Sequence, residues 1–189
     1  MDEPERRSIS ALRLGDARAS ELDEVACLLA DVYGVFRAHL PPAAWENYIS
    51  EIVDVRSRLR ESELIVAKRA GQLVGTIGFY PDASRSALER WPEGWASIRT
   101  LGVRANARRQ GVGEALAREC LRRARERNAK AIGLHTASHM AAARRLYGRL
   151  GFRRAPEFDI EIGEMFTGRS LPPGESWQAQ AYRLDLEGA

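Results

Sequence analysis

Residues 101–119 read LGVRANARRQGVGEALARE, and this stretch is where the fold prediction starts. A β-branched and aromatic run predicts a strand over residues 95–103, ending in Leu-Gly-Val. A short polar connection follows, and from Gly111 or Val112 to Arg127 apolar residues recur at helical spacing. The order is therefore strand, glycine-rich turn, helix.

The turn in this stretch has features of a phosphate-binding loop. It consists of Arg108, Arg109, Gln110, Gly111, Val112 and Gly113. A helix start exposes N–H groups without intrahelical partners, and glycines remove the Cβ atoms that would keep an anion away from them. The two arginines add forked donors at the rim. Such a turn also begins many helices for structural reasons alone, so anion binding remains one of two interpretations here.

Two nucleotide motifs are excluded by the same residues. A P-loop would need a Gly-Lys-Ser/Thr ending, which is missing. A dinucleotide fingerprint would need a third glycine at the position of Leu116.

Outward from this stretch, hydrophobic periodicity and turn residues predict a mixed α/β sheet with helices on both faces. We expect a strand over residues 9–14, a turn at Gly15-Asp16, a helix capped by Ser20 that ends near Gly34, and a second helix over 41–59. Next we expect a hairpin over 64–67 and 73–80 and a loop over 81–94. After the helix that follows Gly111, we expect a strand over 131–137 and a helix capped by Ser138 that ends at Gly151. Strands over 152–162 and 177–186 complete the order βααβββαβαββ.

Composition indicates a single globular domain. The chain has 189 residues, of which 44% are hydrophobic and 29% charged, and no apolar run approaches the roughly 18 to 20 residues of a membrane helix. The N-terminus lacks a signal-peptide core, so we expect a cytoplasmic protein with no membrane partner. Cys27 and Cys120 both lie in predicted helices and are expected to be buried, reduced thiols. Three scattered histidines, His39, His135 and His139, show no metal-ligand spacing, so no metal is expected.

Charge is distributed unevenly although the net charge is only +3. Residues 104–130 contain nine basic and three acidic residues, whereas residues 155–189 contain seven acidic and two basic ones. The basic segment suits a phosphorylated ligand or nucleic acid. Because it lacks interleaved aromatic residues for base stacking, nucleic acid is not the expected partner.

At this point the chain resembles the GNAT superfamily of acyl-CoA-dependent N-acetyltransferases. The family's pyrophosphate loop, Arg/Gln-x-x-Gly-x-Gly/Ala after a Leu-x-Val strand end, corresponds to residues 108–113 after Leu101-Gly102-Val103. A second block, Leu-Tyr-x-x-Leu-Gly-Phe, corresponds to residues 146–152. The resemblance implies a single N-acetyltransferase domain over residues 1–189, with a sheet of about 6–7 strands splayed between the fourth and fifth.

The resemblance also implies roles for particular residues. The donor, acetyl-CoA, would be a co-substrate whose diphosphate lies on residues 108–113 and whose pantetheine arm meets the backbone of Leu101, Gly102 and Val103. Tyr147 is the expected general acid, although its place on an apolar stripe also fits a core tyrosine. The amine would attack the thioester directly in a ternary complex. Met140 stands where many members have a coenzyme-binding Asn, which leaves that contact in doubt.

The acceptor side remains open at this stage. The strand over 95–103 lacks the glutamate that some members use as base, so Glu93 through a water, His135, or no base at all are alternatives. Arg99 would suit a carboxylate-bearing substrate if it faces the cleft, whereas the acidic C-terminal third favours a cationic amine. The acceptor pocket is expected to be shaped by the segment between the first two helices, with Tyr33, Phe36 and His39. Further candidates are Trp91, Trp95, Glu157 and Asp159.

The leading prediction is thus transfer of an acetyl group from acetyl-CoA to a small-molecule or peptide primary amine. The alternative is a non-catalytic acyl-CoA sensor on the same fold. Dimers are common in the family, so a homodimer is among the expected assemblies.

Overall fold

A computed structural model describes residues 11–40, 42–86, 89, 91–168 and 177–186. Its strands are β1 (Arg13–Asp16), β2 (Glu63–Arg69), β3 (Gln72–Tyr80), β4 (Trp95–Val103), β5 (Ala131–Thr136), β6 (Arg153–Arg154), β7 (Ile160–Glu161) and β8 (Gln178–Asp185). Its α-helices are α1 (Leu22–Gly34), α2 (Pro42–Val53), α3 (Val55–Arg58), α4 (Val112–Glu126), α5 (Ala141–Arg149) and α6 (Ile162–Thr167). In the described chain no helix is long and apolar enough to cross a membrane.

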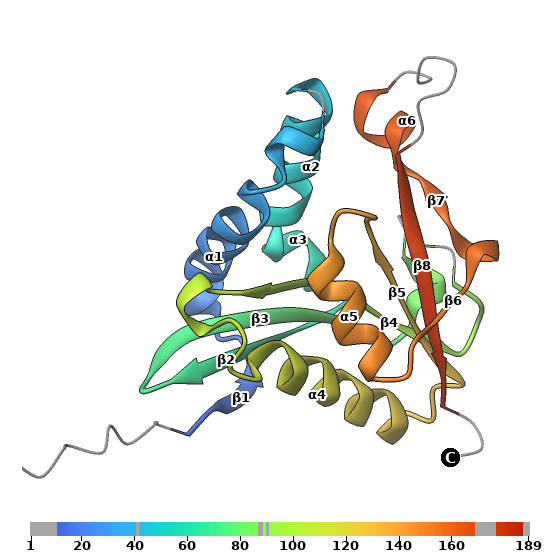
Figure 1. The fold of residues 1–189 in the computed structure, drawn as a ribbon. Helices are drawn as coiled ribbons and strands as arrows, with labels where there is room; N and C mark the ends of the chain where they lie inside the picture. The colour runs from blue at the N-terminus through green and yellow to red at the C-terminus, as the bar shows by residue number, and fades with distance from the viewer. Residues whose placement is uncertain (1–10, 41, 87–88, 90, 169–176, 187–189) are drawn as a thin grey trace, which may run out of the picture.

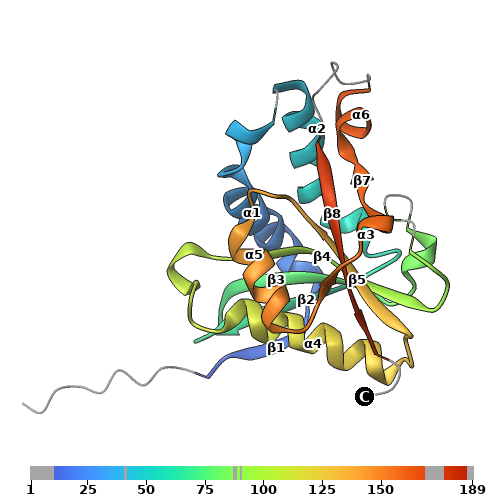
Figure 2. The ribbon, with the colours of Figure 1, turned by 45° about the vertical axis from the view of Figure 1, so that its right-hand side comes forward.

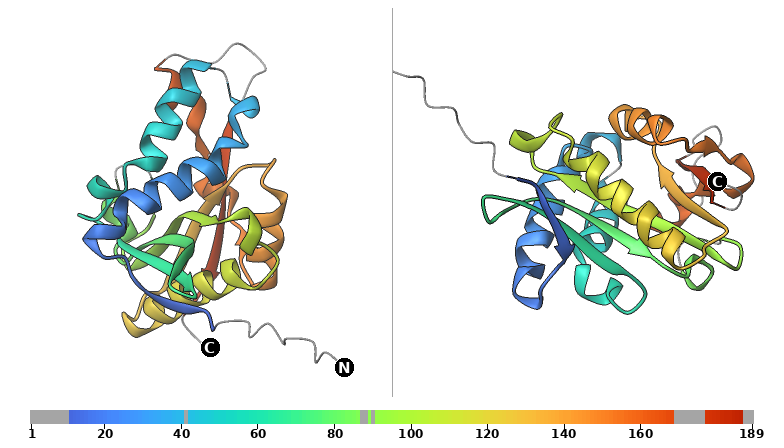
Figure 3. Two further views of the ribbon diagram at one scale, coloured as in Figure 1. Left: turned by 90° about the vertical axis from the view of Figure 1, so that its left-hand side faces the viewer. Right: turned by 90° about the horizontal axis from the view of Figure 1, so that it is seen from below.

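The strands form one mixed sheet, as predicted, although with eight strands rather than six or seven. The order is β1-β2-β3-β4-β5-β8-β6, and β7 pairs with β8 outside this path. All neighbouring pairs are antiparallel except β4 and β5, which are parallel. Figure 1 shows the sheet between α4 on one face and α1 on the other, and the left panel of Figure 3 shows the same layers from the side.

The alternating directions of side chains along the hairpin strands explain why helices cover both faces of the sheet. In β2, Leu64 and Val66 pack with α1 and α2, whereas Ile65 and Ala67 pack with α4. Because successive side chains of a strand point to opposite faces, a continuous apolar run of this kind covers both cores. The hairpin prediction is confirmed.

Several local predictions near the N-terminus are wrong. Gly15 and Asp16 do not turn but belong to β1, where they pair with Val66 and Ile65. Ser20 lies in a short 3₁₀ turn, and Glu21 occupies the N-cap position of α1. The predicted second helix is interrupted at Asp54, whose side chain accepts a hydrogen bond from Ser57 N–H and so caps the short α3. The first two residues of the predicted strand over 9–14 lie outside the described residues.

Two further differences concern the C-terminal half. Met140, not Ser138, is the N-cap of α5. The segment predicted as one strand over 152–162 instead contains the two short strands β6 and β7 and runs into helix α6. Cys120 is buried as expected, but Cys27 is exposed on α1.

Candidate functional site

The parallel pair β4 and β5 separates part of the way along its length. Trp95–Ile98 pair with Ala131–Leu134, but beyond that register the two strands do not pair with each other. We call the diverging ends, residues 99–103 of β4 and 135–136 of β5, the fork. The predicted splay between the fourth and fifth strands is therefore confirmed.

A β-bulge in β4 accounts for the fork. Opposite the two steps from Thr76 to Gly78 in β3, β4 takes three steps from Arg99 to Gly102. Thr100 lies within the bulge, and its φ of 52° is in the left-handed region, which is a strained conformation for a residue other than glycine. Because a bulge bends its strand and increases the local twist, the end of β4 is turned away from β5.

The glycine-rich turn lies directly after the fork arm of β4. Gly111 is the N-cap of α4 with φ 79°, and Arg109 also has a positive φ of 59°. The first bond into the helix runs from Ala115 N–H to the Gly111 carbonyl at 2.9 Å. The N–H groups of Val112, Gly113 and Glu114 precede it and have no partner within the helix, which is the arrangement that binds anions.

Two side chains of the turn bond to the protein's own backbone and hold the turn in place, and one is available to a ligand. Arg108 Nε donates to the Val103 carbonyl at 3.1 Å, and Gln110 Nε2 donates to the Asn106 carbonyl at 2.8 Å. The Gln110 side-chain oxygen accepts from Arg69. Within the described parts of the chain, exposed Arg109 makes no hydrogen bond or ion pair, so its guanidinium is free to meet a ligand.

Three of the predicted site segments come together at this turn. A Cβ atom on Gly113 would lie 3.6 Å from Val103 Cγ2, 3.6 Å from Leu146 Cδ2 and 3.8 Å from Leu101 Cδ2. The start of α4, the end of β4 and the Leu-Tyr block on α5 are therefore neighbours. Gly102 has a packing role as well, since a Cβ there would come within 2.9 Å of Leu28 Cδ2 on α1.

Tyr147 lies in the core beside this junction. It is 5% exposed and its ring meets Phe152 edge-on at 5.6 Å. Burial raises the pKa of its phenol, and the nearby Tyr33 adds to the rise. The hydroxyl therefore stays protonated at neutral pH. Tyr147 does not line the cavity described next.

A cavity of about 140 Å³ opens on the fork. Its floor comes from β4 and β5, and its walls come from α1, α2, β7, α6 and β8. The lining residues are Tyr33, Tyr48, Glu51, Ile52, Glu89, Arg99, Thr100, His135, Thr136, Ala137, Met140, Ile160, Ile162, Phe166 and Ala179. We refer to it below as the acceptor cavity.

Helices α2 and α6, which both line the acceptor cavity, lie at the top of the molecule in Figure 2. Tyr48 packs edge-on against Phe166 with ring centroids 5.4 Å apart, and Asn47 Nδ2 donates to the Phe166 carbonyl at 2.8 Å. Helix α6 was not predicted, because its six residues span less than two helical turns and so cannot show a repeated helical period.

Buried charges form the floor of the cavity. Arg99 Nη2 donates to Glu51 Oε1 at 2.9 Å, and Arg99 Nε lies 3.5 Å from Glu89 Oε1. Trp91 Nε1 donates to Glu89 Oε2 at 2.8 Å, and His135 Nδ1 lies 3.2 Å from Glu89 Oε1. Burial raises the pKa of the Glu89 carboxyl, but His135, Arg99 and Trp91 together hold it below its ordinary value.

Glu89 connects the two arms of the fork. Arg99 and His135 are the first residues past the last paired positions of β4 and β5, and both side chains reach the same carboxylate. Sequence reasoning missed Glu89 and Glu51, since neither belongs to a motif and their neighbours come from distant segments.

The proposed bases do not have the geometry of a base. His135 Nε2 lies 2.8 Å from the Phe158 carbonyl, which can only accept, so this nitrogen carries a proton. Nδ1 is buried and lies 3.2 Å from Glu89 Oε1, so its nearest polar neighbour is that carboxylate rather than an amine in the cavity. Glu93 is exposed and is not part of the cavity lining.

Of the other acceptor-site candidates, only Tyr33 lines the cavity, where its hydroxyl donates to the Leu101 carbonyl at 3.4 Å. Phe36 and His39 pack on His139 nearby, with the two imidazoles stacked at 4.4 Å. The remaining candidates have other partners. Trp91 and Trp95 stack on each other, Glu157 pairs with Arg183, and Asp159 pairs with Arg154. No cluster of three or more metal-ligating side chains occurs in the described residues.

Comparison with protein families gives a match over residues 22–152 to the family described as "Acetyltransferase (GNAT) family". N-acetyltransferase 8 of Rattus norvegicus is 31% identical over 128 residues, which are 62% of this chain and 55% of the relative. N-acetyltransferase 8 of Mus musculus is 28% identical over 138 residues, 68% of this chain and 58% of the relative. The chain thus spans a little over half the length of these relatives.

Solved structures show the same fold. An acetyltransferase of the GNAT family from Staphylococcus aureus Mu50 superposes with a TM-score of 0.66 at 16% identity, covering 94% of this chain and 100% of that one. A Bacillus subtilis acetyltransferase in complex with CoA superposes with a TM-score of 0.63 at 18% identity, covering 94% and 99%.

Proposed function

Because the chain belongs to the GNAT acetyltransferase family, we propose that it transfers an acetyl group from acetyl-CoA to a primary amine. Acyl transfer from an acyl-CoA donor follows from the family. The acetyl donor, the amine acceptor and the roles of single residues are our proposal. The observation that carries it is the fork, which opens between the glycine-rich turn at one end and the acceptor cavity at the other.

The turn has the donors that a diphosphate requires. Three N–H groups at the start of α4 lack helical partners, the helix dipole adds positive potential, and Arg109 is unpaired within the described chain. Arg108 and Gln110 would act by holding the turn, since their side chains bond to the protein's own carbonyls. The residues present therefore fit a coenzyme A diphosphate.

The fork offers exposed strand edge to the pantetheine arm. Residues 99–103 have a neighbour in β3 but none in β5, so an extended amide-containing chain can pair with them as an added strand would. We assign this role to the backbone of Leu101, Gly102 and Val103. The Leu101 carbonyl accepts from Tyr33 and the Val103 carbonyl from Arg108.

When bound, acetyl-CoA would supply an activated thioester that a neutral amine attacks directly, and the nitrogen would lose a proton to water as the amide forms. Tyr147 would donate a proton to the departing thiolate and regain one from water. The role is supported by a phenol that is protonated at neutral pH and by its place on the helix that packs against Gly113. The amine would enter through the acceptor cavity.

The test is release of free thiol from acetyl-CoA across a panel of amines, with acetylated product identified by mass spectrometry. Acetylation of at least one amine by the wild-type protein is the expected result. Tight acyl-CoA binding without turnover of any amine would instead favour the acyl-CoA sensor.

A further inference from the structure

The charged residues that line the acceptor cavity are two glutamates and one arginine. Glu51 and Glu89 both pair with Arg99, and Glu89 also lies beside His135 Nδ1. Arg99 already contacts Glu51, Glu89 and the Tyr80 hydroxyl, the last at 3.5 Å, and His135 Nε2 donates to the Phe158 carbonyl. The charge of Arg99 is therefore already matched by two carboxylates of the protein, which disfavours a further carboxylate from a substrate.

Among the charged side chains of the cavity, Glu51 keeps an oxygen without a donor, and the buried hydroxyls of Thr100 and Thr136 also lack a partner in the described chain. Arg99 bonds Glu51 through Oε1, and no described residue donates a hydrogen bond to Glu51 Oε2. The Glu51 side chain is 26% exposed, compared with 14% for Arg99 and 6% for Glu89. Arg58 lies 4.0 Å from the same Oε1, but its guanidinium donates to the main-chain carbonyls of Glu51 and Ile52. A ligand that brings a donor would complete the hydrogen bonding of Glu51.

The walls around Glu51 are apolar and aromatic. Tyr33, Tyr48 and Phe166 contribute rings, and Met140, Ile160 and Ile162 contribute aliphatic surface. An ammonium group is stabilised both by a carboxylate and by aromatic faces. The volume of about 140 Å³ is well below that of drug-sized sites, which are roughly 300 to 1,000 Å³. Only a compact molecule, or the amine-bearing end of a longer one, fits.

We propose that the acceptor is an alkylamine or arylalkylamine with a compact apolar body and no carboxylate beside the amine, that its ammonium group is recognised by Glu51, and that it loses a proton to water before the neutral amine attacks. This inference rests on the proposed acyl transfer for its location, but it concerns recognition and can be measured without turnover. Arg99 acts as a positioning residue that holds Glu51 in place.

The experiment compares phenethylamine with L-phenylalanine, which differ only by the α-carboxylate. Their binding to the CoA-saturated protein is measured by calorimetry. We expect phenethylamine to bind about tenfold or more tightly than L-phenylalanine, and Glu51→Gln to weaken phenethylamine binding about tenfold or more while CoA affinity stays unchanged. Glu46→Gln is the matched control, because Glu46 is an exposed glutamate on the same helix outside the cavity. This variant should bind phenethylamine like the wild type.

The wild-type comparison keeps the proposal testable even if Glu51→Gln fails to fold. Equal or tighter binding of L-phenylalanine would overturn it in favour of carboxylate recognition by Arg99, as would absence of phenethylamine binding. A parallel thiol-release assay separates the two proposals. Selective binding of phenethylamine without turnover supports amine recognition and contradicts acyl transfer, whereas turnover of other amines without this selectivity contradicts only the recognition proposal.

Discussion

The depth at which single side chains lie determines what they can do in this protein. Tyr147 is buried among apolar neighbours, and burial raises the pKa of its phenol, which stays protonated at neutral pH but is a weaker acid than an exposed tyrosine. Gly113 is half-buried at the fork, and its missing side chain leaves the N–H groups at the start of α4 accessible.

The first prediction concerns the Tyr147 hydroxyl. Tyr147→Phe removes only the hydroxyl and keeps the ring packing, so we expect kcat to fall by about tenfold or more while acyl-CoA affinity changes little. Steady-state kinetics and calorimetry check this. Tyr182→Phe on β8 is the control and should leave both quantities unchanged. Full activity of Tyr147→Phe would show that the tyrosine serves packing alone.

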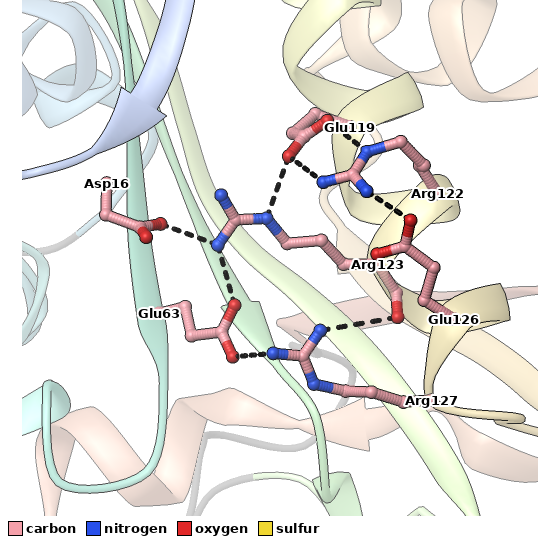
Figure 4. A network of polar contacts seen from close by, with 7 residues as sticks. All are labelled: Asp16, Glu63, Glu119, Arg122, Arg123, Glu126 and Arg127. Carbon is pink, nitrogen blue, oxygen red and sulfur yellow. Dashed lines mark hydrogen bonds and ion pairs between the residues drawn. The ribbon is translucent and has the colours of Figure 1, made fainter.

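Between elements, partly buried arginines attach α4 to the edge of the sheet. Figure 4 shows Arg123 of α4 bonded to Asp16 of β1 at 2.6 Å, to Glu63 of β2 at 2.6 Å and to Glu119 at 2.9 Å. Arg127 also pairs with Glu63. Since Arg123 is only 11% exposed, its ion pairs are less screened by water than those on an open surface.

We therefore expect Arg123→Ala to lower the free energy of unfolding by about 2 kcal/mol, because it leaves Glu63 and Glu119 with fewer partners. Arg125→Ala is the control. Arg125 is exposed on the same helix and has no ion pair within the described chain, so its loss should change stability by less than about 0.5 kcal/mol. Urea denaturation measures both. Equal effects would mean that the network contributes nothing specific.

Glu89 joins a second pair of elements, strands β4 and β5. Glu89→Gln preserves shape but leaves Arg99 and His135 facing a neutral amide, so we expect a loss of about 3 to 5 kcal/mol in stability and weaker acyl-CoA binding. Denaturation and calorimetry check this. Glu93→Gln, an exposed residue four positions on, should behave like the wild type.

The pH dependence of this loss follows from the lowered pKa of Glu89. A carboxyl whose pKa is lower in the folded state adds stability above its unfolded value of about 4.3, and that stability disappears as the pH falls through the folded value. The gap between wild type and Glu89→Gln should therefore be full at neutral pH and shrink below about pH 4. A gap that is independent of pH would contradict the ionic role of Glu89.

At the scale of the whole molecule, the sheet is continuous through only four paired positions between β4 and β5. The half with β1–β4 and the half with β5–β8 are also joined by the Glu89 bridge, by the contact of α2 with α6, and by the core that α4 and α5 share with both strands. A ligand that lies in the fork would contact both halves and stabilise the folded state.

We predict that acetyl-CoA at about a hundred times its Kd adds about 2.7 kcal/mol of stability, which corresponds to a rise in Tm of about 5 to 10 °C for a chain of this size. Gly113→Asp should remove the shift and keep the fold, because a Cβ there makes only ordinary contacts while a carboxylate repels the diphosphate. Thermal unfolding with and without acetyl-CoA tests this. A retained shift in the variant would place the diphosphate elsewhere.

Ion pairs within the chain neutralise much of the positive charge of the basic segment 104–130. Arg104, Arg118, Arg122, Arg123 and Arg127 all pair with carboxylates of the chain. In the described chain Arg108, Arg109, Arg125 and Lys130 have no ion pair, so fewer than half of the nine cations of the segment remain to contact a phosphate backbone. We predict that duplex DNA binds only weakly at about 50 mM salt, as fluorescence anisotropy would measure.

The sequence by itself determined the family and most element types. Periodicity and turn chemistry are local properties, so residues 95–103, the hairpin, the helix after Gly111 and the Leu-Tyr block could be read directly. The turn Arg108–Gly113 was recognisable because its geometry depends on residues adjacent in the chain.

Only the tertiary structure decided how the acceptor side is built. Glu51, Glu89, Arg99 and His135 meet from four separate segments, and no local pattern predicts that convergence. Helix α6 is too short to show a period and is held by its contacts with α2. The exposure of Cys27 depends on which face of α1 meets the sheet. The donor site that we propose is therefore readable from neighbouring residues, whereas the acceptor site that we propose depends on contacts between distant ones.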